Sequence, residues 1–435
     1  MAEPELHLFV LWEKARFREK RILSDMAREL EIVCVREQRF TDEPMLSYRR
    51  FYGPALPDAR RKLRSCGAGP FLVVVVRDPA PAYGTCTVDG CEYRNVDVRL
   101  VKLKRRYRNW THRRHRVHGT TTRGEFARDV LMLTGHTAEE WARGVPAGDW
   151  PLRLPDCWAA VSGPVGPAVL APGPLPEIRD ARVFLRDKYI NDTFEDGMFG
   201  GTPCIVKRTS KAVWSIGNEY RLASRMYAAA PAAVPRPLAW WYDCAAHAAA
   251  VVTAKVAGPS LAELLAHGVT DAQADGFAAD ILALAAALTR EGVLHRDLFP
   301  DNLLLDADGH LKAIDWQLAI DRARYREDPW VMRNWKFRYV VFGVNRELGL
   351  GVWNDFHALG KVLAQLPQTA AVREAAARLA AEADGMAFAS PPQGWTRFRL
   401  WLYGCSLRLQ MLLNRRRPEK HARLERRWRT VRCRW

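Results

Sequence analysis

VLHRDLFPDNLLLDADGHLKAIDWQLAI, residues 293–320, gathers aspartates between runs of Leu, Ile and Val in a chain that is otherwise strongly basic. Its segment H-R-D-L-F-P-D-N fits the pattern H-R-D-L-x-x-x-N at every fixed position. Asp315 follows Asn302 by thirteen residues, after two strand-like segments that meet in a turn at Asp308. The two ends of a β-hairpin lie side by side, so the pattern predicts that Asp297, Asn302 and Asp315 lie together.

These three residues suit the transfer of a phosphoryl group. The reaction needs one carboxylate that accepts the proton of a hydroxyl, and an amide and a carboxylate that hold Mg²⁺ against the phosphates of a nucleotide. We therefore assign Asp297 as the candidate base, and Asn302 and Asp315 as candidate Mg²⁺ ligands, because this cation prefers hard oxygen donors. The expected cofactors are ATP and Mg²⁺. Asp306 and Asp308 are interpreted as turn residues.

The motif and its spacing to Asp315 resemble those of the protein-kinase-like superfamily, over residues 181 to about 390. Within it, this part of the chain is most similar to the bacterial lipopolysaccharide kinase group, which phosphorylates sugars of envelope glycans. The resemblance implies an α+β, two-lobed kinase-like fold with a small β-rich lobe and a larger helical lobe. It also implies an enzyme that phosphorylates an alcohol group.

The resemblance assigns roles to three further residues. Lys207 in CIVKRT matches the strand lysine that contacts the nucleotide phosphates, and Glu219 in GNEYRLA matches the helix glutamate that pairs with it. Their separation of twelve residues is shorter than in typical eukaryotic kinases, so a solvated strand-end lysine and an unrelated glutamate remain alternatives. Asp355 in WNDFHALGKVL matches the aspartate that braces the catalytic loop, with an ordinary helix N-cap as the alternative.

A glycine-containing segment, FEDGMFGGTP, precedes the Lys207 strand and is the candidate phosphate-covering loop. Its glycines do not fit G-x-G-x-x-G, so Gly200 and Gly201, together with Gly197, are either nucleotide-binding residues or simple turn residues.

The chain departs from the protein-kinase pattern in features associated with a peptide substrate. Phe299 stands where many Ser/Thr kinases have lysine, Trp316 and Gln317 replace the usual Phe-Gly, and no clear Ala-Pro-Glu follows. These departures favour a glycan or lipid-linked sugar acceptor. Two rival hypotheses remain: a protein Ser/Thr kinase, and a polyanion-binding scaffold with an inactive kinase fold.

Composition and the position of Pro- and Gly-rich sequence predict the organisation of the whole chain. The 435 residues contain 66 Lys and Arg against 49 Asp and Glu, a formal net charge of +17 that favours anionic partners. We do not expect nucleic acid among them. The predicted segments are an α/β domain of unknown function (1–160), a Pro/Gly-rich linker (161–177), a kinase-like domain (178–395) and a basic amphipathic tail (396–435).

The N-terminal part alternates apolar strand-like runs with helical segments, which predicts a three-layer α/β domain. Residues 99–123 contain ten Lys or Arg and no carboxylate, interleaved with aromatic and His residues, and run into the start of a helix. This basic strip can hold a phosphate, with His118 as the residue to test, or it can be a solvated basic face. A nucleotidyltransferase or glycosyltransferase activity is a further hypothesis for this domain.

The last forty residues carry thirteen Lys or Arg and two Glu around an apolar block, residues 398–413. This tail is interpreted either as an interfacial helix on an anionic membrane or as a last helix packed on the kinase-like domain. The N-terminus reads as a strand and not as a secretory signal, and no apolar run reaches the ~20 residues of a membrane span. Nine scattered cysteines favour reduced thiols. We therefore expect a cytoplasmic protein, either free or attached peripherally to the inner membrane.

Overall fold

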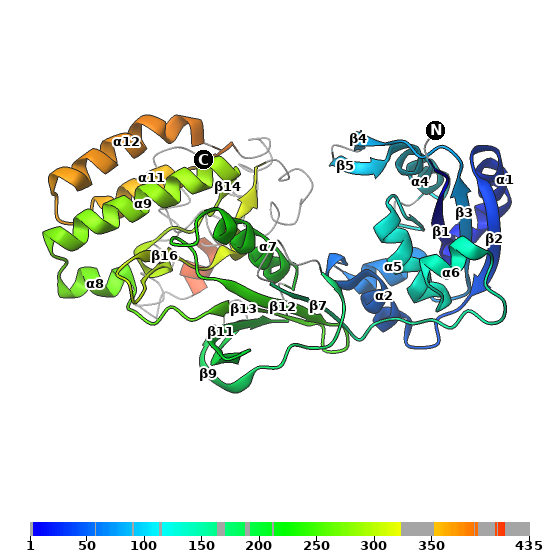
Figure 1. Cartoon of the computed structure of the whole chain (residues 1–435), viewed down its shortest axis with the longest axis horizontal. Helices are drawn as coiled ribbons and strands as arrows, with labels where there is room; N and C mark the ends of the chain where they lie inside the picture. Colours follow the sequence, from blue (N-terminus) through cyan, green and yellow to red (C-terminus); the bar gives the residue numbers. More distant parts are fainter. Residues whose placement is uncertain are drawn as a thin grey trace.

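The computed structural model describes residues 3–56, 58–88, 91–112, 115–162, 170–187, 192–210, 213–322, 352–386, 388–389, 405–406 and 408–413. Figure 1 shows an N-terminal domain that runs from β1 to α6, and beyond it a sheet and a group of long helices formed by the rest of the described chain.

The N-terminal domain is built on a four-stranded sheet with the order β2-β3-β1-β6. Its strands are β1 (Glu5–Leu11), β2 (Glu31–Gln38), β3 (Phe71–Asp78) and β6 (Val117–Gly119). A separate hairpin is formed by β4 (Tyr83–Val88) and β5 (Cys91–Asp97). The run FLVVVV in β3 is buried throughout, because it is the second strand from the edge and both faces of the sheet are covered.

Helices cover both faces of this sheet, as the three-layer prediction requires. They are α1 (Glu19–Glu29), α2 (Pro44–Tyr52), α3 (Ala59–Cys66), α4 (Val98–Trp110), α5 (Arg123–Thr134) and α6 (Ala138–Arg143), with short 3₁₀ turns η1 (Glu13–Arg18) and η2 (Gly53–Ala55). One apolar cluster joins the sheet to α1 and α4, and another joins it to α2, α3 and α5.

The strand directions differ from those of an α/β domain. β1 and β2 flank β3, and each pairs with β3 in the antiparallel sense. The strands β1 and β2, which the helix α1 connects, are not neighbours, because β3 lies between them. The connection therefore does not produce a hydrogen-bonded parallel pair. The predicted alternation of strands and helices is present, but it cannot reveal which strand is inserted between the other two.

The second half of the chain has the predicted two-lobed α+β architecture. A seven-stranded antiparallel sheet has the order β8-β7-β12-β13-β11-β10-β9 and carries one long helix, α7 (Val213–Ala229). Its strands are β7 (Cys157–Val161), β8 (Ala171–Pro172), β9 (Arg179–Asp187), β10 (Asp192–Phe199), β11 (Thr202–Thr209), β12 (Pro237–Asp243) and β13 (Ala248–Ala254).

The larger lobe is helical. Its helices are α8 (Leu261–His267), α9 (Asp271–Glu291), α11 (Asp355–Leu363) and α12 (Ala370–Met386). Three short strand pairs accompany them. In these pairs β14 (Val293–Leu294) joins β17 (Ile320–Asp321), β15 (Leu303–Leu305) joins β16 (Leu311–Ala313), and β18 (Val352–Trp353) joins β19 (Phe388–Ala389). The Ala- and Leu-rich α9 is the centre of this lobe, because its buried face packs on both α11 and α12. Two 3₁₀ turns, η3 (Pro300–Asn302) and η4 (Trp316–Leu318), flank the β15–β16 hairpin.

The boundary between the domains lies earlier than the sequence predicted. β7 ends at Val161 and β8 lies at 171–172, so the segment 161–177, predicted to be a linker, has strands at its start and within it. β7 pairs with β12 over five residues, and β8 pairs with β7. The seven-stranded sheet thus begins at Cys157, because Pro- and Gly-rich sequence is compatible with an edge strand as well as with a linker.

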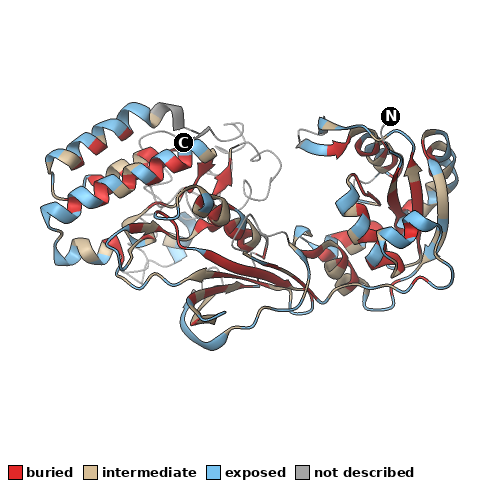
Figure 2. Cartoon of the chain, viewed as in Figure 1, coloured by how far each residue is buried: buried red, intermediate tan, exposed pale blue. Residues whose placement is uncertain are grey.

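The two halves also share an apolar core, which the prediction of a separate N-terminal domain did not anticipate. Ile216 and Tyr220 of α7 belong to the same buried cluster as Tyr48 and Phe51 of α2. Trp158 of β7 belongs to this cluster too, and its indole Nε1 donates to the carbonyl of Arg50 at 2.9 Å. Figure 2 shows the buried central strands of the sheet that continue toward the N-terminal domain. The N-terminal domain therefore braces the helix that carries Glu219.

Most of the basic tail lies outside the described residues. Within its apolar block, Leu409, Leu412 and Leu413 are described and are 58%, 54% and 76% exposed. None of the helices in the described ranges combines the length and apolar character that a membrane span requires.

Candidate active site

Lys207 is the centre of a buried charge cluster between the two lobes. It lies on β11, and its ammonium is 3.1 Å from Oε2 of Glu219 on α7 and 2.6 Å from Oδ1 of Asp315. Burial disfavours the charged form, but the Asp315 and Glu219 carboxylates outweigh it and raise the pKa of Lys207 well above its usual value. The alternative of a solvated strand-end lysine is thereby excluded.

Two residues that sequence reasoning missed complete the surroundings of Lys207. Phe194 pairs with Lys207 across β10 and β11, and the ammonium lies 5.7 Å from the centre of its ring. Asp192, buried at the start of β10, adds a negative charge that further raises the pKa of Lys207. Neither position carries a recognisable motif, so only strand pairing could have revealed them.

The hairpin predicted between Asn302 and Asp315 is confirmed. Leu303 pairs with Ala313 at the open end of β15 and β16, and the Ile314 N–H donates to the Asn302 carbonyl at 3.0 Å. In the turn, the Asp306 carboxylate accepts hydrogen bonds from the backbone N–H groups of Asp308 and His310 at 3.0 and 2.9 Å. Asp306 thus closes the turn and does not reach the charge cluster.

His295 ties the H-R-D segment to the strand that precedes Asp315. Its Nε2 donates to the Ile314 carbonyl at 2.9 Å, since a carbonyl can only accept. Nδ1 then carries the lone pair and accepts the Asp297 N–H at 3.3 Å. Burial lowers the pKa of His295 to about 4, so the ring is neutral near pH 7 and acts as a fixed bracket.

Asp297 is held by Asn302, in agreement with their proximity in the motif. The Asn302 amide donates to the Asp297 carbonyl at 2.8 Å and to its Oδ2 at 3.2 Å. Burial, reinforced by the neighbouring Asp315 charge, raises the pKa of Asp297 to about 7. A carboxylate with this pKa is a stronger base than an exposed aspartate, as proton abstraction from a hydroxyl requires.

Asp355 braces the loop from behind. Its Oδ2 accepts the His295 N–H at 2.6 Å and its Oδ1 accepts the Arg296 N–H at 2.9 Å. Arg296 has a left-handed φ of 71°, which a non-glycine residue adopts only when its surroundings enforce it. Asn354, not Asp355, is the N-cap of α11, so the alternative assignment of Asp355 as a helix cap is wrong.

We expect Asp355→Ala to lower the free energy of unfolding by roughly 2–4 kcal/mol, because two buried backbone N–H groups lose their acceptor. Urea denaturation of the purified protein measures the change. Asp308→Ala, in the exposed turn, is the control and should stay within about 0.5 kcal/mol of wild type. Equal midpoints for Asp355→Ala and the control would remove the bracing role.

Oxygen donors suitable for Mg²⁺ come from one amide and one carboxylate, Asn302 and Asp315. Asp315 also has a left-handed φ, 62°, at the turn that follows β16. Within the described ranges, no group of three or more His, Cys, Asp or Glu side chains is placed to hold a metal ion. This donor set fits a cation that usually takes one or two protein carboxylates and completes its shell with water and substrate phosphates.

Gly200 and Gly201 form the two-residue turn between β10 and β11. Their φ values, 54° and 81°, lie in the left-handed region that such hairpin turns require, which accounts for both glycines. A Cβ at Gly197 would lie 2.9 Å from the Ile178 side chain, so that glycine permits close packing of β10 on the chain before β9. Contact of Gly200 and Gly201 with a nucleotide stays a prediction.

The fold is that of a kinase-like domain, and Lys207, Asp297 and Asp315 lie together between its two lobes. In agreement, residues 228–320 match the model of the phosphotransferase enzyme family APH, a segment that includes Asp297, Asn302 and Asp315. The serine/threonine-protein kinase cbk1 of Emericella nidulans is 29% identical over 110 residues, which cover 25% of this chain and 12% of that kinase. The serine/threonine-protein kinase AtPK1/AtPK6 of Arabidopsis thaliana is 42% identical over 43 residues, 10% of this chain and 9% of that kinase. The chain therefore spans about a tenth of the length of these curated relatives.

Proposed function

We propose that this protein transfers the γ-phosphoryl group of ATP to a hydroxyl group, with Mg²⁺ as the metal ion. The observation that carries the proposal is the Lys207 ammonium, buried between Glu219 and Asp315 at 3.1 and 2.6 Å. Replacement of a buried ion cluster by well-packed hydrophobic side chains often leaves the free energy of unfolding unchanged or raises it. The value of this cluster therefore lies in the fixed position of the ammonium group and not in stability.

Each group of the cluster has a role in this reaction. Asp297 accepts the hydroxyl proton, and its raised pKa suits that step. Asn302 and Asp315 supply oxygen ligands to Mg²⁺, which neutralises the phosphate charge when bound. Lys207 would contact the nucleotide phosphates, while Glu219 keeps the ammonium in place. Together they align the reacting oxygen with the phosphorus, which is the main contribution a protein makes to this chemistry.

The preferred acceptor is a sugar hydroxyl on a cell-envelope glycan or lipopolysaccharide-type precursor. Phe299 in place of lysine and Trp316-Gln317 after Asp315 support it, since both remove features that accompany peptide substrates. Trp316 is buried against His295, with ring centres 4.4 Å apart, so this position serves packing of the loop. The basic charge of the chain also suits an acceptor that already carries phosphate or carboxylate.

The acceptor can be identified with radiolabelled ATP and a lysate of the source cells. We expect label in a protease-resistant, glycan- or lipid-linked fraction, and we expect Asp297→Asn to abolish that transfer. The second candidate function, a protein Ser/Thr kinase, is favoured by the names of the curated relatives. Label mainly on Ser or Thr of proteins, well above autophosphorylation, would support that candidate and contradict the sugar acceptor.

We also propose that the basic tail recruits the protein to an anionic membrane surface, as an inner-membrane acceptor would require. The exposed Leu409, Leu412 and Leu413 support an apolar contact, and the thirteen basic residues from 396 on support an electrostatic one. Each basic residue near such a surface adds up to about 1 kcal/mol, so a minority of them would suffice.

Vesicle co-sedimentation tests this recruitment. Vesicles with anionic phosphatidylglycerol should bind the full chain, neutral phosphatidylcholine vesicles should not, and binding should fall as salt rises. Deletion of residues 415–435 should remove most of the binding. Salt-independent binding, or no effect of the deletion, would favour the tail as a packed helix instead.

A further inference from the structure

A second cluster of charged side chains lies in the N-terminal domain, around His118 on β6. The Nε2 atom of His118 is 2.7 Å from Oδ2 of Asp129 on α5, and both side chains are buried. The other oxygen of Asp129 accepts a hydrogen bond from Nε of Arg128 at 2.7 Å. Because a carboxylate accepts, the proton of the neutral imidazole lies on Nε2 and the lone pair on Nδ1.

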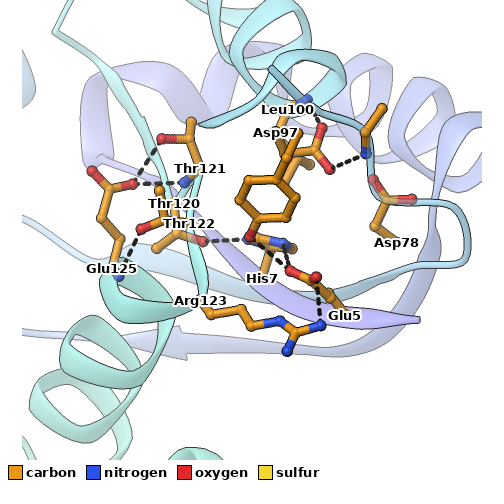
Figure 3. A network of polar contacts seen from close by, with 12 residues as sticks. Glu5, His7, Asp78, Asp97, Leu100, Thr120, Thr121, Thr122, Arg123 and Glu125 are labelled. Atoms are coloured by element: carbon orange, nitrogen blue, oxygen red, sulfur yellow. Dashed lines mark hydrogen bonds and ion pairs between the residues drawn. The ribbon is translucent and has the colours of Figure 1, made fainter. Parts of the chain in front are cut away.

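The His118 ring is fixed in orientation by its neighbours. The rings of Phe51 and Tyr52 on α2 lie edge-on to it, with centres 5.3 and 5.5 Å away. The turn that follows is held by Thr120, whose hydroxyl accepts the Leu8 N–H at 3.0 Å, and by Glu125, which accepts the Thr121 N–H at 2.6 Å. Figure 3 shows these threonines and Glu125 within a polar network at the start of α5.

Cationic side chains approach this ring from two other helices. Lys62 of α3 lies 4.3 Å from the centre of the Tyr52 ring and donates to the His115 carbonyl at 3.0 Å. Lys104 and Arg108 lie one turn apart on α4, and Nε of Arg108 donates to the carbonyl of Val117, next to His118, at 2.9 Å. The charges of Lys104 and Lys62 both act on His118, and with its burial they help to keep the pKa of its imidazole low, at about 4.

The carboxylates near this cluster are already engaged. Asp129 pairs with Arg128 and His118, and Glu125 caps α5 through Thr121. Within the described ranges, Lys62 contacts neutral groups and Lys104 makes no hydrogen bond or ion pair. Burial lowers the pKa of each of these two lysines to about 8. Lys62 is buried and Lys104 is partly exposed, and neither ammonium group has a hydrogen-bonded carboxylate within the described ranges, so the pair favours a bound anion.

We propose that Lys62, Lys104 and His118 form a phosphate-binding site in the N-terminal domain, distinct from the kinase-like site. Lysine ammonium groups are point charges that bind phosphate oxygens in many geometries. A phosphate group also keeps a proton part of the time near neutral pH, which it can donate to the lone pair of Nδ1. Sulfate has no such proton, so the site should prefer phosphate.

The sequence left two interpretations of the basic strip 99–123, a phosphate-binding strip and a solvated basic face, and each applies to different residues of it. Lys102 and Arg105 of α4 are exposed and form a solvated basic face, whereas Lys104 and Arg108 are partly buried on the other side, where Arg108 reaches the Val117 carbonyl of β6. The helical period separates them, because residues three or four positions apart share a side of the helix, whereas Lys102 and Lys104, two positions apart, lie on different sides.

Isothermal titration calorimetry of the full chain with inorganic phosphate tests the site. We expect binding that is weakened roughly ten- to hundredfold in Lys104→Gln, because one charge-assisted hydrogen bond is lost. Lys102→Gln removes the same charge from the exposed face of the same helix and should bind as wild type. Lys104→Arg, which keeps the charge, should restore most of the affinity, and thermal unfolding verifies that each variant is folded.

Further titrations distinguish this site from the kinase-like site and identify the source of the phosphate. Phosphate binding should persist in Lys207→Gln, and sulfate at equal ionic strength should bind more weakly, a preference that His118→Asn should abolish. Tighter, Lys104-dependent binding of pyrophosphate than of phosphate indicates the phosphoryl end of a larger ligand, and the reverse indicates free phosphate. Equal affinities in Lys104→Gln and Lys102→Gln, loss of binding in Lys207→Gln, or no phosphate binding at all would overturn the proposal.

Discussion

Mg²⁺-dependent ATP turnover should fall by at least ~10²- to 10⁴-fold in both Asp297→Asn and Asp315→Asn, and stay near wild type in Asp308→Asn. Asparagine keeps the shape of each side chain, so the loss reports charge and not packing. In Asp297→Asn the acceptor of the hydroxyl proton is gone. In Asp315→Asn the charged metal ligand is gone, and the Lys207 ammonium loses its partner at 2.6 Å.

A coupled assay of ADP release, with thermal unfolding as the measure of folding, tests this expectation. Asp308 is the matched control, because it is an aspartate of the same hairpin that faces solvent in the turn. Comparable turnover in all three folded variants would contradict the proposed catalysis and favour the scaffold with an inactive kinase fold.

A fragment that begins at residue 178 should fail to fold into a soluble domain. It lacks β7 and β8, so β12 loses a strand partner over five residues and presents an open apolar edge. It also lacks the N-terminal domain, which exposes Ile216, Tyr220 and Trp240 of the shared core. Burial of one such side chain contributes about 1.5–3 kcal/mol, so the summed loss is comparable with the whole stability of a domain.

A second fragment separates the two causes. Residues 151–435 keep β7 and β8 but still expose the face of α7 that packs on α2, so they should express better than residues 178–435 and remain less soluble than the full chain. Co-expression with residues 1–150 should restore solubility if the shared core is responsible. A soluble, monomeric fragment 178–435 with a cooperative urea transition would show that neither the added strands nor the interface is needed.

The catalytic-loop residues were predictable because their arrangement is local. Asp297, Asn302 and Asp315 are joined by one hairpin, and the hairpin is specified by short apolar runs around an Asp-Gly turn. Lys207 and Glu219 followed from the resemblance to kinases, since they lie on a strand and the next helix. Their spacing is fixed by that strand–helix unit, so the sequence motif carries most of the geometry.

The resemblance assigned the bracing role to Asp355, but the choice between that role and a helix N-cap needed the tertiary structure, as did the two sides of the basic strip. Asp355 lies about sixty residues after His295, and only the packing of α11 beneath the loop turns its carboxylate toward two backbone N–H groups. The base strength of Asp297 depends in the same way on burial, because its pKa rises through desolvation that no neighbour in sequence determines.

Strand pairing across long stretches of chain was the part that the sequence alone left undetermined. Composition predicted strands and a linker, but β7 pairs with β12 about eighty residues later, and β3 enters between β1 and β2 after they form one helical crossover. An isolated strand has no preference for one such partner, because pairing depends on the side chains and hydrogen-bonding groups that another strand presents. Local motifs therefore specify the reacting groups here, and non-local pairing specifies how far the domain that holds them extends.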